Sequence, residues 1–261
     1  MPRRTFAKSL GAASLLGALG ATTVPAQQPS AKIRLYRFEF LYLQIGDQGT
    51  RLAKFYESQM PLLTKNISLV GVFNSQVSPH NPTMMILKGY TGYDQMLASD
   101  KAIRADAGYQ KALAELEQPD LPPYDSADSA LIDLADFSPD YLPLKEKPKT
   151  GRIFELRYYR SATERQHGYV MDRFGGKEKE IFHRVGIDPI MMGTMVVGQD
   201  TPNWVYLTPF NNLAEREKAW DIFAADPEWL RVRADSITHG GQIVTKQNIT
   251  LYKAAAYSQI Q

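Results

Sequence analysis

The sequence predicts an α+β fold in which two tandem copies of one β-α-β-β-α-β unit pack sheet to sheet as an α+β barrel. Three short matches between the two halves of the chain indicate the duplication. The matched segments keep one order at a spacing of 118 or 120 positions: residues 35–40 with 153–158, 105–109 with 225–229, and 137–138 with 257–258. A constant order at almost one spacing is what a duplicated unit produces.

Each half is predicted to begin with a strand and a helix. Residues 32–40 and 151–160 alternate in polarity and are rich in β-forming residues, so both are predicted strands. The helix that follows has one face that repeats at helical spacing. That face consists of Leu52, Phe55, Tyr56, Gln59 and Leu63 in the first half, and of Val170, Met171, Phe174, Ile181, Phe182 and Val185 in the second.

A hairpin, a second helix and a last strand complete each unit. The hairpin strands are predicted at residues 69–77 with 84–90 and at 190–197 with 204–210, and the last strands at 130–137 and 242–252. In the second half, Asn212 and Glu215 form a candidate capping box at the start of the helix. Asp226 and Pro227 indicate a break and a restart of that helix, because Asp caps and Pro suits the first helical position.

This element order is ferredoxin-like, with an open sheet that has helices on one face only. The other face needs cover, and two copies in one chain can supply it to each other. The predicted organisation is a first repeat at residues 27–137, a Pro- and Lys-rich linker at 138–150 and a second repeat at 151–261.

The first 26 residues have the layout of an export signal. Arg3, Arg4 and Lys8 precede a short Gly- and Ala-rich apolar run, and small residues follow near Ala26. The adjacent arginines resemble the twin-arginine signal, so we expect a periplasmic or extracellular protein that begins near Gln27. The alternative is a basic N-terminal arm in which the pair of arginines occurs by chance.

Composition indicates a globular protein and excludes several classes. Of the 261 residues, 44% are hydrophobic and 22% charged, which fits neither a disordered nor a collagen-like chain. No run of eighteen apolar residues predicts a membrane span, and the absence of cysteine excludes disulfides and thiol chemistry. The net charge of +2 falls to −1 without the three basic residues of the export signal, so no nucleic-acid partner is expected.

Four segments of the second half resemble the NIPSNAP family. They are residues 151–159, 181–187, 202–206 and, most specifically, 214–229. The first half keeps the pattern and loses most of these motifs. The resemblance implies the dimeric α+β barrel superfamily, in agreement with the fold deduced from the repeat. It implies little about chemistry, because that superfamily includes oxygenases, haem-handling enzymes and proteins without enzymatic activity.

The four histidines do not form a metal-binding pattern, and neither a metal nor a cofactor is expected. His183 points away from the apolar stripe of its helix, whereas His167 points with it. His167 is therefore either a structural histidine or the best candidate for a general base. His80 and His239 are expected in loops.

Two further motifs allow a functional and a structural interpretation. Residues 226–229 resemble a family motif, but a helix restart with Trp229 as a packing anchor explains them. Residues 175–177 contain two glycines and a lysine without the strand and spacing of a phosphate loop, so a helix irregularity is expected. No nucleophile motif is present.

The first strands carry charges of opposite sign at equivalent positions. Arg37 corresponds to Glu155 and Glu39 to Arg157, and Tyr159 lies on the same strand face as Glu155 and Arg157. We expect these residues either to form an ion-pair network between the two repeats or to line a ligand pocket.

The sequence favours a protein that binds a small molecule or a protein partner, and it allows a homo-oligomer. The alternative is a cofactor-free oxygenase or isomerase that acts in a pocket in the barrel or between sheet and helices. In that case Arg157 and Tyr159 would orient the substrate, with His167 as the base.

Overall fold

The computed structural model describes residues 32–261 except 142, 143, 145, 147 and 149, and Lys32–Gln261 forms one compact unit. The predicted export signal at residues 1–26 and the predicted start at Gln27 lie outside the described residues. No helix in the described part of the chain is long and apolar enough to cross a membrane.

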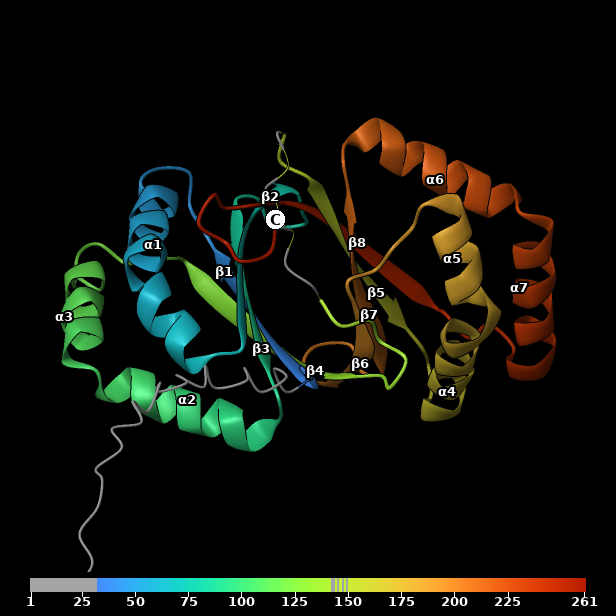
Figure 1. Ribbon diagram of the computed structural model, residues 1–261, viewed down its shortest axis with the longest axis horizontal. Helices are drawn as coiled ribbons and strands as arrows, with labels where there is room; N and C mark the ends of the chain where they lie inside the picture. The colour runs from blue at the N-terminus through green and yellow to red at the C-terminus, as the bar shows by residue number, and fades with distance from the viewer. Residues whose placement is uncertain (1–31, 142–143, 145, 147, 149) are drawn as a thin grey trace, which may run out of the picture. The chain divides into compact units, whose positions relative to one another are not determined.

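Eight antiparallel strands form a closed barrel in the order β1-β3-β2-β8-β5-β7-β6-β4 (Figure 1). The strands are β1 (Leu35–Tyr42), β2 (Leu69–Val77), β3 (Thr83–Tyr90), β4 (Ser126–Leu134), β5 (Ile153–Arg160), β6 (Met191–Val197), β7 (Asn203–Phe210) and β8 (Lys246–Ala254). Each half supplies four neighbouring strands, and the halves meet where β2 pairs with β8 and β4 with β6. The predicted pair of ferredoxin-like repeats, packed as an α+β barrel, is confirmed.

The helices cover the outer faces of the two sheets (Figure 1). The first half has α1 (Gln48–Asn66), α2 (Tyr93–Ala105) and α3 (Ala107–Leu116). The second half has α4 (Glu164–Arg173), the π-helical turn η1 (Phe174–Glu178), α5 (Lys179–Val185), α6 (Leu213–Ala225) and α7 (Pro227–Gly240). The irregularity expected at residues 175–177 is this π-helical turn.

Side-chain caps explain where the second helix of each half breaks. The Asp226 side chain accepts hydrogen bonds from the backbone N–H groups of Glu228 and Trp229, at 2.9 and 3.0 Å. Asp106, at the equivalent position, accepts one from Tyr109 N at 2.8 Å. Both carboxylates satisfy donors that a helix start leaves without partners. The break predicted at Asp226 is confirmed, and its counterpart occurs in the first half.

Strand alternation separates the core into three layers. Alternate residues such as Phe38 of β1 and Leu156 of β5 pack inside the barrel. Their neighbours, such as Leu41 and Tyr159, face the helices of their own half. Each repeat therefore has a layer between sheet and helices, and the two repeats share the barrel interior.

The segment after the last strand of each half bonds to the other half. Ser138 Oγ accepts a hydrogen bond from Met192 N of β6 at 3.0 Å, and Ser258 Oγ accepts one from Val72 N of β2 at 3.1 Å. This reciprocal exchange explains why residues 137–138 and 257–258 match in sequence. These two segments therefore join the repeats, in addition to the backbone pairing of β2 with β8 and of β4 with β6.

Some strand ends differ from the prediction. The first strand, expected at residues 32–40, is Leu35–Tyr42, and the strand expected at 130–137 is Ser126–Leu134. Residues 135–138 leave the strand because Phe137 turns against Gly175, where an added Cβ would lie 2.8 Å from the Phe137 ring. The strand expected at 242–252 is Lys246–Ala254. Its apolar start, Ile243, packs instead with the residues between the sheet and helices of the second half.

Candidate ligand site

The charged residues of the first strands face the helices, so they do not meet across the barrel. The predicted ion-pair network between the repeats is wrong. The charged residues cannot meet because successive side chains of a strand point to opposite faces. Large apolar residues such as Phe38 and Phe154 occupy the inward positions, which leaves Arg37 and Glu155 on the outward face. Each repeat instead has its own ion-pair cluster between sheet and helices.

In the second repeat the cluster is buried and complete. Glu155 is fully buried and pairs with Arg157 of its own strand and with Arg216 of α6. The Arg157 guanidinium lies 3.5 Å from the centre of the Trp220 ring and donates to the Tyr159 hydroxyl at 3.3 Å. With these partners, Arg157 and Tyr159 are held by protein groups. Their predicted role in binding a ligand remains a prediction that this packing does not favour.

In the first repeat the equivalent cluster is partly open. Arg37 donates two hydrogen bonds to the Asp100 carboxylate of α2 at 2.6 and 2.7 Å. Lys88 of β3 donates to Glu39 at 2.8 Å, and the side chains of Arg37 and Glu39 are 18% and 23% exposed. Burial raises the pKa of Asp100, but the hydrogen bond from Arg37 and the charges of Arg37 and Lys88 outweigh it, so the pKa is lowered.

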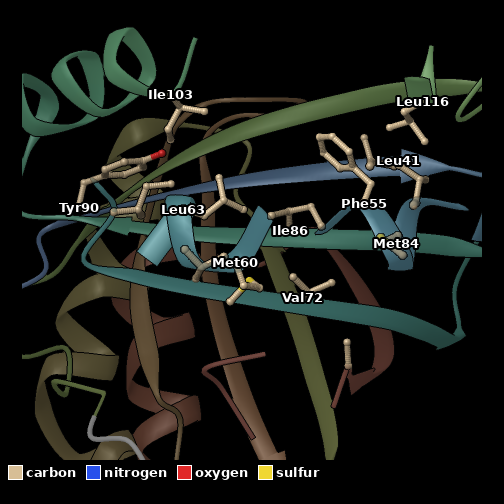
Figure 2. Packing of buried hydrophobic residues seen from close by; sticks show 14 of the residues in the cluster. Leu41, Phe55, Met60, Leu63, Val72, Met84, Ile86, Tyr90, Ile103 and Leu116 are labelled. Atoms are coloured by element: carbon tan, nitrogen blue, oxygen red, sulfur yellow. The ribbon is translucent and has the colours of Figure 1, made fainter. Parts of the chain in front are cut away.

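A cavity of about 590 Å³ lies beside this open cluster, between the sheet and α1–α3. Arg37, Glu39, Lys88 and Asp100 form part of its wall. Apolar side chains from the strands and the three helices form much of the rest: Leu41, Leu52, Phe55, Leu63, Ile103, Leu113 and Leu116. Figure 2 shows several of these residues lying between the sheet and the helices, together with neighbours such as Met84 and Ile86.

Aromatic side chains fill the equivalent space in the second repeat. Tyr159 stands where the first repeat has Leu41, and Trp204, Tyr206 and Trp220 stand where it has Met84, Ile86 and Asp100. Tyr206 donates to the Tyr159 hydroxyl at 2.7 Å, and Phe174 packs 5.3 Å from the ring of Trp204. A hollow of about 250 Å³ remains near Tyr159, lined by Arg173 of α4, by α7 and by residues 242–247 at the start of β8. Larger side chains therefore explain why the larger of these cavities lies in the first repeat.

His167 is buried beside this aromatic cluster. It is 3% exposed, its Nε2 lies 2.9 Å from the Thr194 hydroxyl, and burial lowers its pKa. Its Nδ1 has no hydrogen-bond partner among the described residues. His167 lines neither of these two cavities. A base needs a substrate within hydrogen-bond reach, so this placement favours the structural interpretation.

The remaining predicted positions have structural roles or lie at the surface. His183 is exposed as predicted and pairs with Asp188 at 2.6 Å. His239 ends α7 rather than lying in a loop, and His80 lies in the turn between β2 and β3. Trp229 packs 4.4 Å from the Phe223 ring, which confirms its role as an anchor. No group of three or more potential metal-binding side chains occurs among the described residues.

The site contains residues that the sequence did not single out, chiefly Lys88 and Asp100. Lys88 lies directly opposite Arg37 in the β1–β3 ladder and reaches Glu39, two residues along β1 on the same face. Its own strand was predicted at residues 84–90. The alternation of that strand could therefore have indicated Lys88. Asp100 comes from a helix whose rotation on the sheet the sequence did not define.

Residues 154–259 match the model of the NIPSNAP family. The resemblance is thus confirmed for the second repeat, while the first lies outside the match. No match was found among curated proteins.

Solved structures share the fold of both repeats. A proposed monooxygenase of Fusobacterium nucleatum superposes with a TM-score of 0.58 at 12% identity, over 85% of this chain and 93% of that one. A protein described as anthrone oxidase-like superposes with a TM-score of 0.53 at 10% sequence identity, over 87% of this chain and 93% of that one. A NIPSNAP family protein of Agrobacterium tumefaciens gives a TM-score of 0.39 at 13% sequence identity, over 46% of this chain and 100% of that one. At such identities the likeness to the first two structures concerns the fold alone.

Proposed function

We propose that this protein binds a small, mostly apolar molecule in the first-repeat cavity, and that it does so after export from the cytoplasm. The observation that carries the proposal is the difference between the repeats. Two copies of one unit share a fold, yet aromatic residues occupy much of the space between sheet and helices in the second repeat, whereas the first has a cavity of about 590 Å³ there. A volume of this size suits a small organic ligand.

The lining defines the chemistry of the ligand. The leucines, Phe55 and Ile103 favour an apolar or aromatic body. Most charged groups at the sheet pair with one another, as Arg37 does with Asp100 and Lys88 with Glu39, and the unpaired Asp128 lies at the border of the cavity, where Tyr42 and Gln199 donate to it. Tyr56 also lines the cavity, and burial raises its pKa well above the ordinary value, so its hydroxyl stays protonated. An uncharged ligand with one or two hydrogen-bonding groups fits best.

Filling the cavity tests the proposal. Leu41→Tyr places in the first repeat the residue that the second repeat has at the equivalent position, Tyr159. We expect it to weaken binding of the uncharged fluorescent probe N-phenyl-1-naphthylamine by about tenfold or more, because the added ring occupies the ligand's space. Leu97→Tyr is the control, since Leu97 is 61% exposed on α2. Equal binding by Leu41→Tyr and the control would reject the site, and mass spectrometry of molecules retained by the native protein would identify its ligand.

A second candidate is cofactor-free oxidation of a molecule held in the same cavity. The fold neighbours described as monooxygenases and as anthrone oxidase-like favour it. Anthrone is therefore the first substrate to try, and its conversion to anthraquinone consumes one O₂ and releases one water. Oxygen uptake that Leu41→Tyr abolishes would support this candidate, whereas ligand retention without uptake would support binding alone.

Export is tested separately. Replacing Arg3 and Arg4 by lysine should keep the protein in the cytoplasm, because the twin-arginine signal depends on that pair. The measurement is cell fractionation with N-terminal sequencing of the exported protein, which should begin near Gln27. Exported protein that still begins at Pro2 would contradict the proposal.

A further inference from the structure

A second cavity, of about 380 Å³, opens at one end of the barrel. It lies where the barrel seams are incomplete. β4 begins at Ser126 but pairs with β6 only from Leu131, and β8 begins at Lys246 but pairs with β2 only from Leu251. The first residues of β4 and β8 therefore have no partner strand on one side. The inward side chains at this end surround an opening, whereas further inside they pack against each other.

Aromatic side chains from both repeats line this opening. Phe40 and Tyr42 come from the end of β1, Tyr158 from β5 and Tyr252 from β8. Burial, and next the other phenols nearby, raise the pKa of Tyr158 and of Tyr252, so both stay uncharged at neutral pH. Neutral aromatic rings attract cations through the negative potential of their faces.

Asp128 of β4 supplies a carboxylate that lacks a cationic partner. Its Oδ2 accepts hydrogen bonds from the Tyr42 hydroxyl at 2.8 Å and from Gln199 Nε2 at 2.6 Å. Both donors are uncharged, and no Lys or Arg of the described residues forms an ion pair with Asp128. The two hydrogen bonds fix the carboxylate in place, and its negative charge remains available to a ligand.

The other charged groups of the cavity neutralise each other at its rim. Asp200 pairs with Lys246 at 2.7 Å, and the charge of Arg160 acts on Asp200 as well. His80 lies on the Asp128 side, with its ring 4.7 Å from that of Tyr42. Lys246 is thus neutralised by Asp200, whereas Asp128 has only uncharged hydrogen-bond partners among the described residues.

We propose that this barrel-end cavity binds a small organic ammonium ion. The ammonium group lies against Asp128, where the free carboxylate oxygen accepts its hydrogen bond and the neighbouring tyrosine rings stabilise its charge. The apolar part of the ligand lies along Phe40 and Tyr252. The ligand differs in charge from the one proposed for the first-repeat cavity, so the two sites can be tested independently.

The test compares three probes of similar shape: phenethylammonium, its uncharged analogue 2-phenylethanol, and the anion phenylacetate. Isothermal titration calorimetry on the full chain should show phenethylammonium binding at least about tenfold more tightly than 2-phenylethanol, and phenylacetate not binding, as expected for a partly desolvated carboxylate with aromatic neighbours. Asp128→Asn keeps an oxygen that accepts from Tyr42 and removes the charge, so it should abolish the preference. Asp133→Asn, an exposed position on the same strand, is the matched control.

Asp128 also borders the first-repeat cavity, so N-phenyl-1-naphthylamine is titrated in parallel. Its affinity should not change in Asp128→Asn. Equal binding of phenethylammonium and 2-phenylethanol would overturn the proposal in favour of a site for neutral polar molecules. Unchanged ammonium binding by Asp128→Asn would overturn it as well. Lys246→Gln should act in the opposite direction and tighten ammonium binding several-fold, because it removes a repelling charge and leaves Asp200 unpaired.

Discussion

Replacing Glu155 by alanine should lower the free energy of unfolding by about 3–5 kcal/mol, the range expected when a buried pair loses one partner. Glu155 is fully buried and is the acid shared by Arg157 and Arg216. Its loss leaves the buried Arg157 guanidinium without a carboxylate and leaves Arg216 with only the exposed Glu217. Denaturant unfolding of the wild-type protein and of Glu155→Ala measures the effect.

The other members of the cluster provide controls. Arg157→Ala should cost less, because Glu155 keeps Arg216. The double variant should cost less than the two single effects added together, since the residues share one network. In the first repeat, Glu39→Ala should cost only about 1 kcal/mol, because the Glu39 side chain is 23% exposed and Arg37 keeps Asp100. Additive effects, or equal losses for Glu39 and Glu155, would contradict a buried network confined to the second repeat.

The sequence predicted the fold well because the evidence for it is repeated and local. Strand alternation, caps such as Asp226 and a matched second copy each constrain the same answer, and duplication supplies every signal twice. The position of Arg37 and Glu39 on one strand face was likewise readable from a period of two. Whether that face points into the barrel or toward the helices could not be predicted, because the alternation shows that the two strand faces differ but not what packs on each.

The candidate sites were harder to predict because they depend on distant residues. Asp100 reaches Arg37 from a helix 63 positions later, and Gln199 reaches Asp128 from the other repeat. Cavities arise from side-chain volumes summed over several elements, so no single motif reports them. The aligned repeats do carry one usable signal. The second repeat has Trp204 and Tyr206 where the first has the smaller Met84 and Ile86. This difference in side-chain volume indicates which repeat has free space.

Trp204→Ala should open in the second repeat a cavity like that of the first. Trp204 is fully buried among Phe174, Phe137 and His167, at ring distances of 5.3, 5.8 and 6.4 Å. Its Nε1 has no hydrogen-bond partner among the described residues, so the substitution removes packing and not a hydrogen bond. The expected loss is about 3–5 kcal/mol, the usual cost of replacing a buried Trp or Phe by alanine.

Indole distinguishes an open cavity from a collapsed one. If the aromatic cluster of the second repeat is what excludes ligands there, indole should occupy the space left by the Trp204 side chain. At ten times its dissociation constant it should restore about 1.4 kcal/mol of stability to Trp204→Ala. The measurement is the denaturant midpoint with and without indole. Trp229→Ala serves as the control, because Trp229 is only partly buried and its removal should leave an open groove rather than an enclosed cavity. A loss in Trp204→Ala that indole does not reverse would mean that the surrounding rings close the gap. The difference between the repeats would then lie in how their helices pack and not in the volume of this side chain.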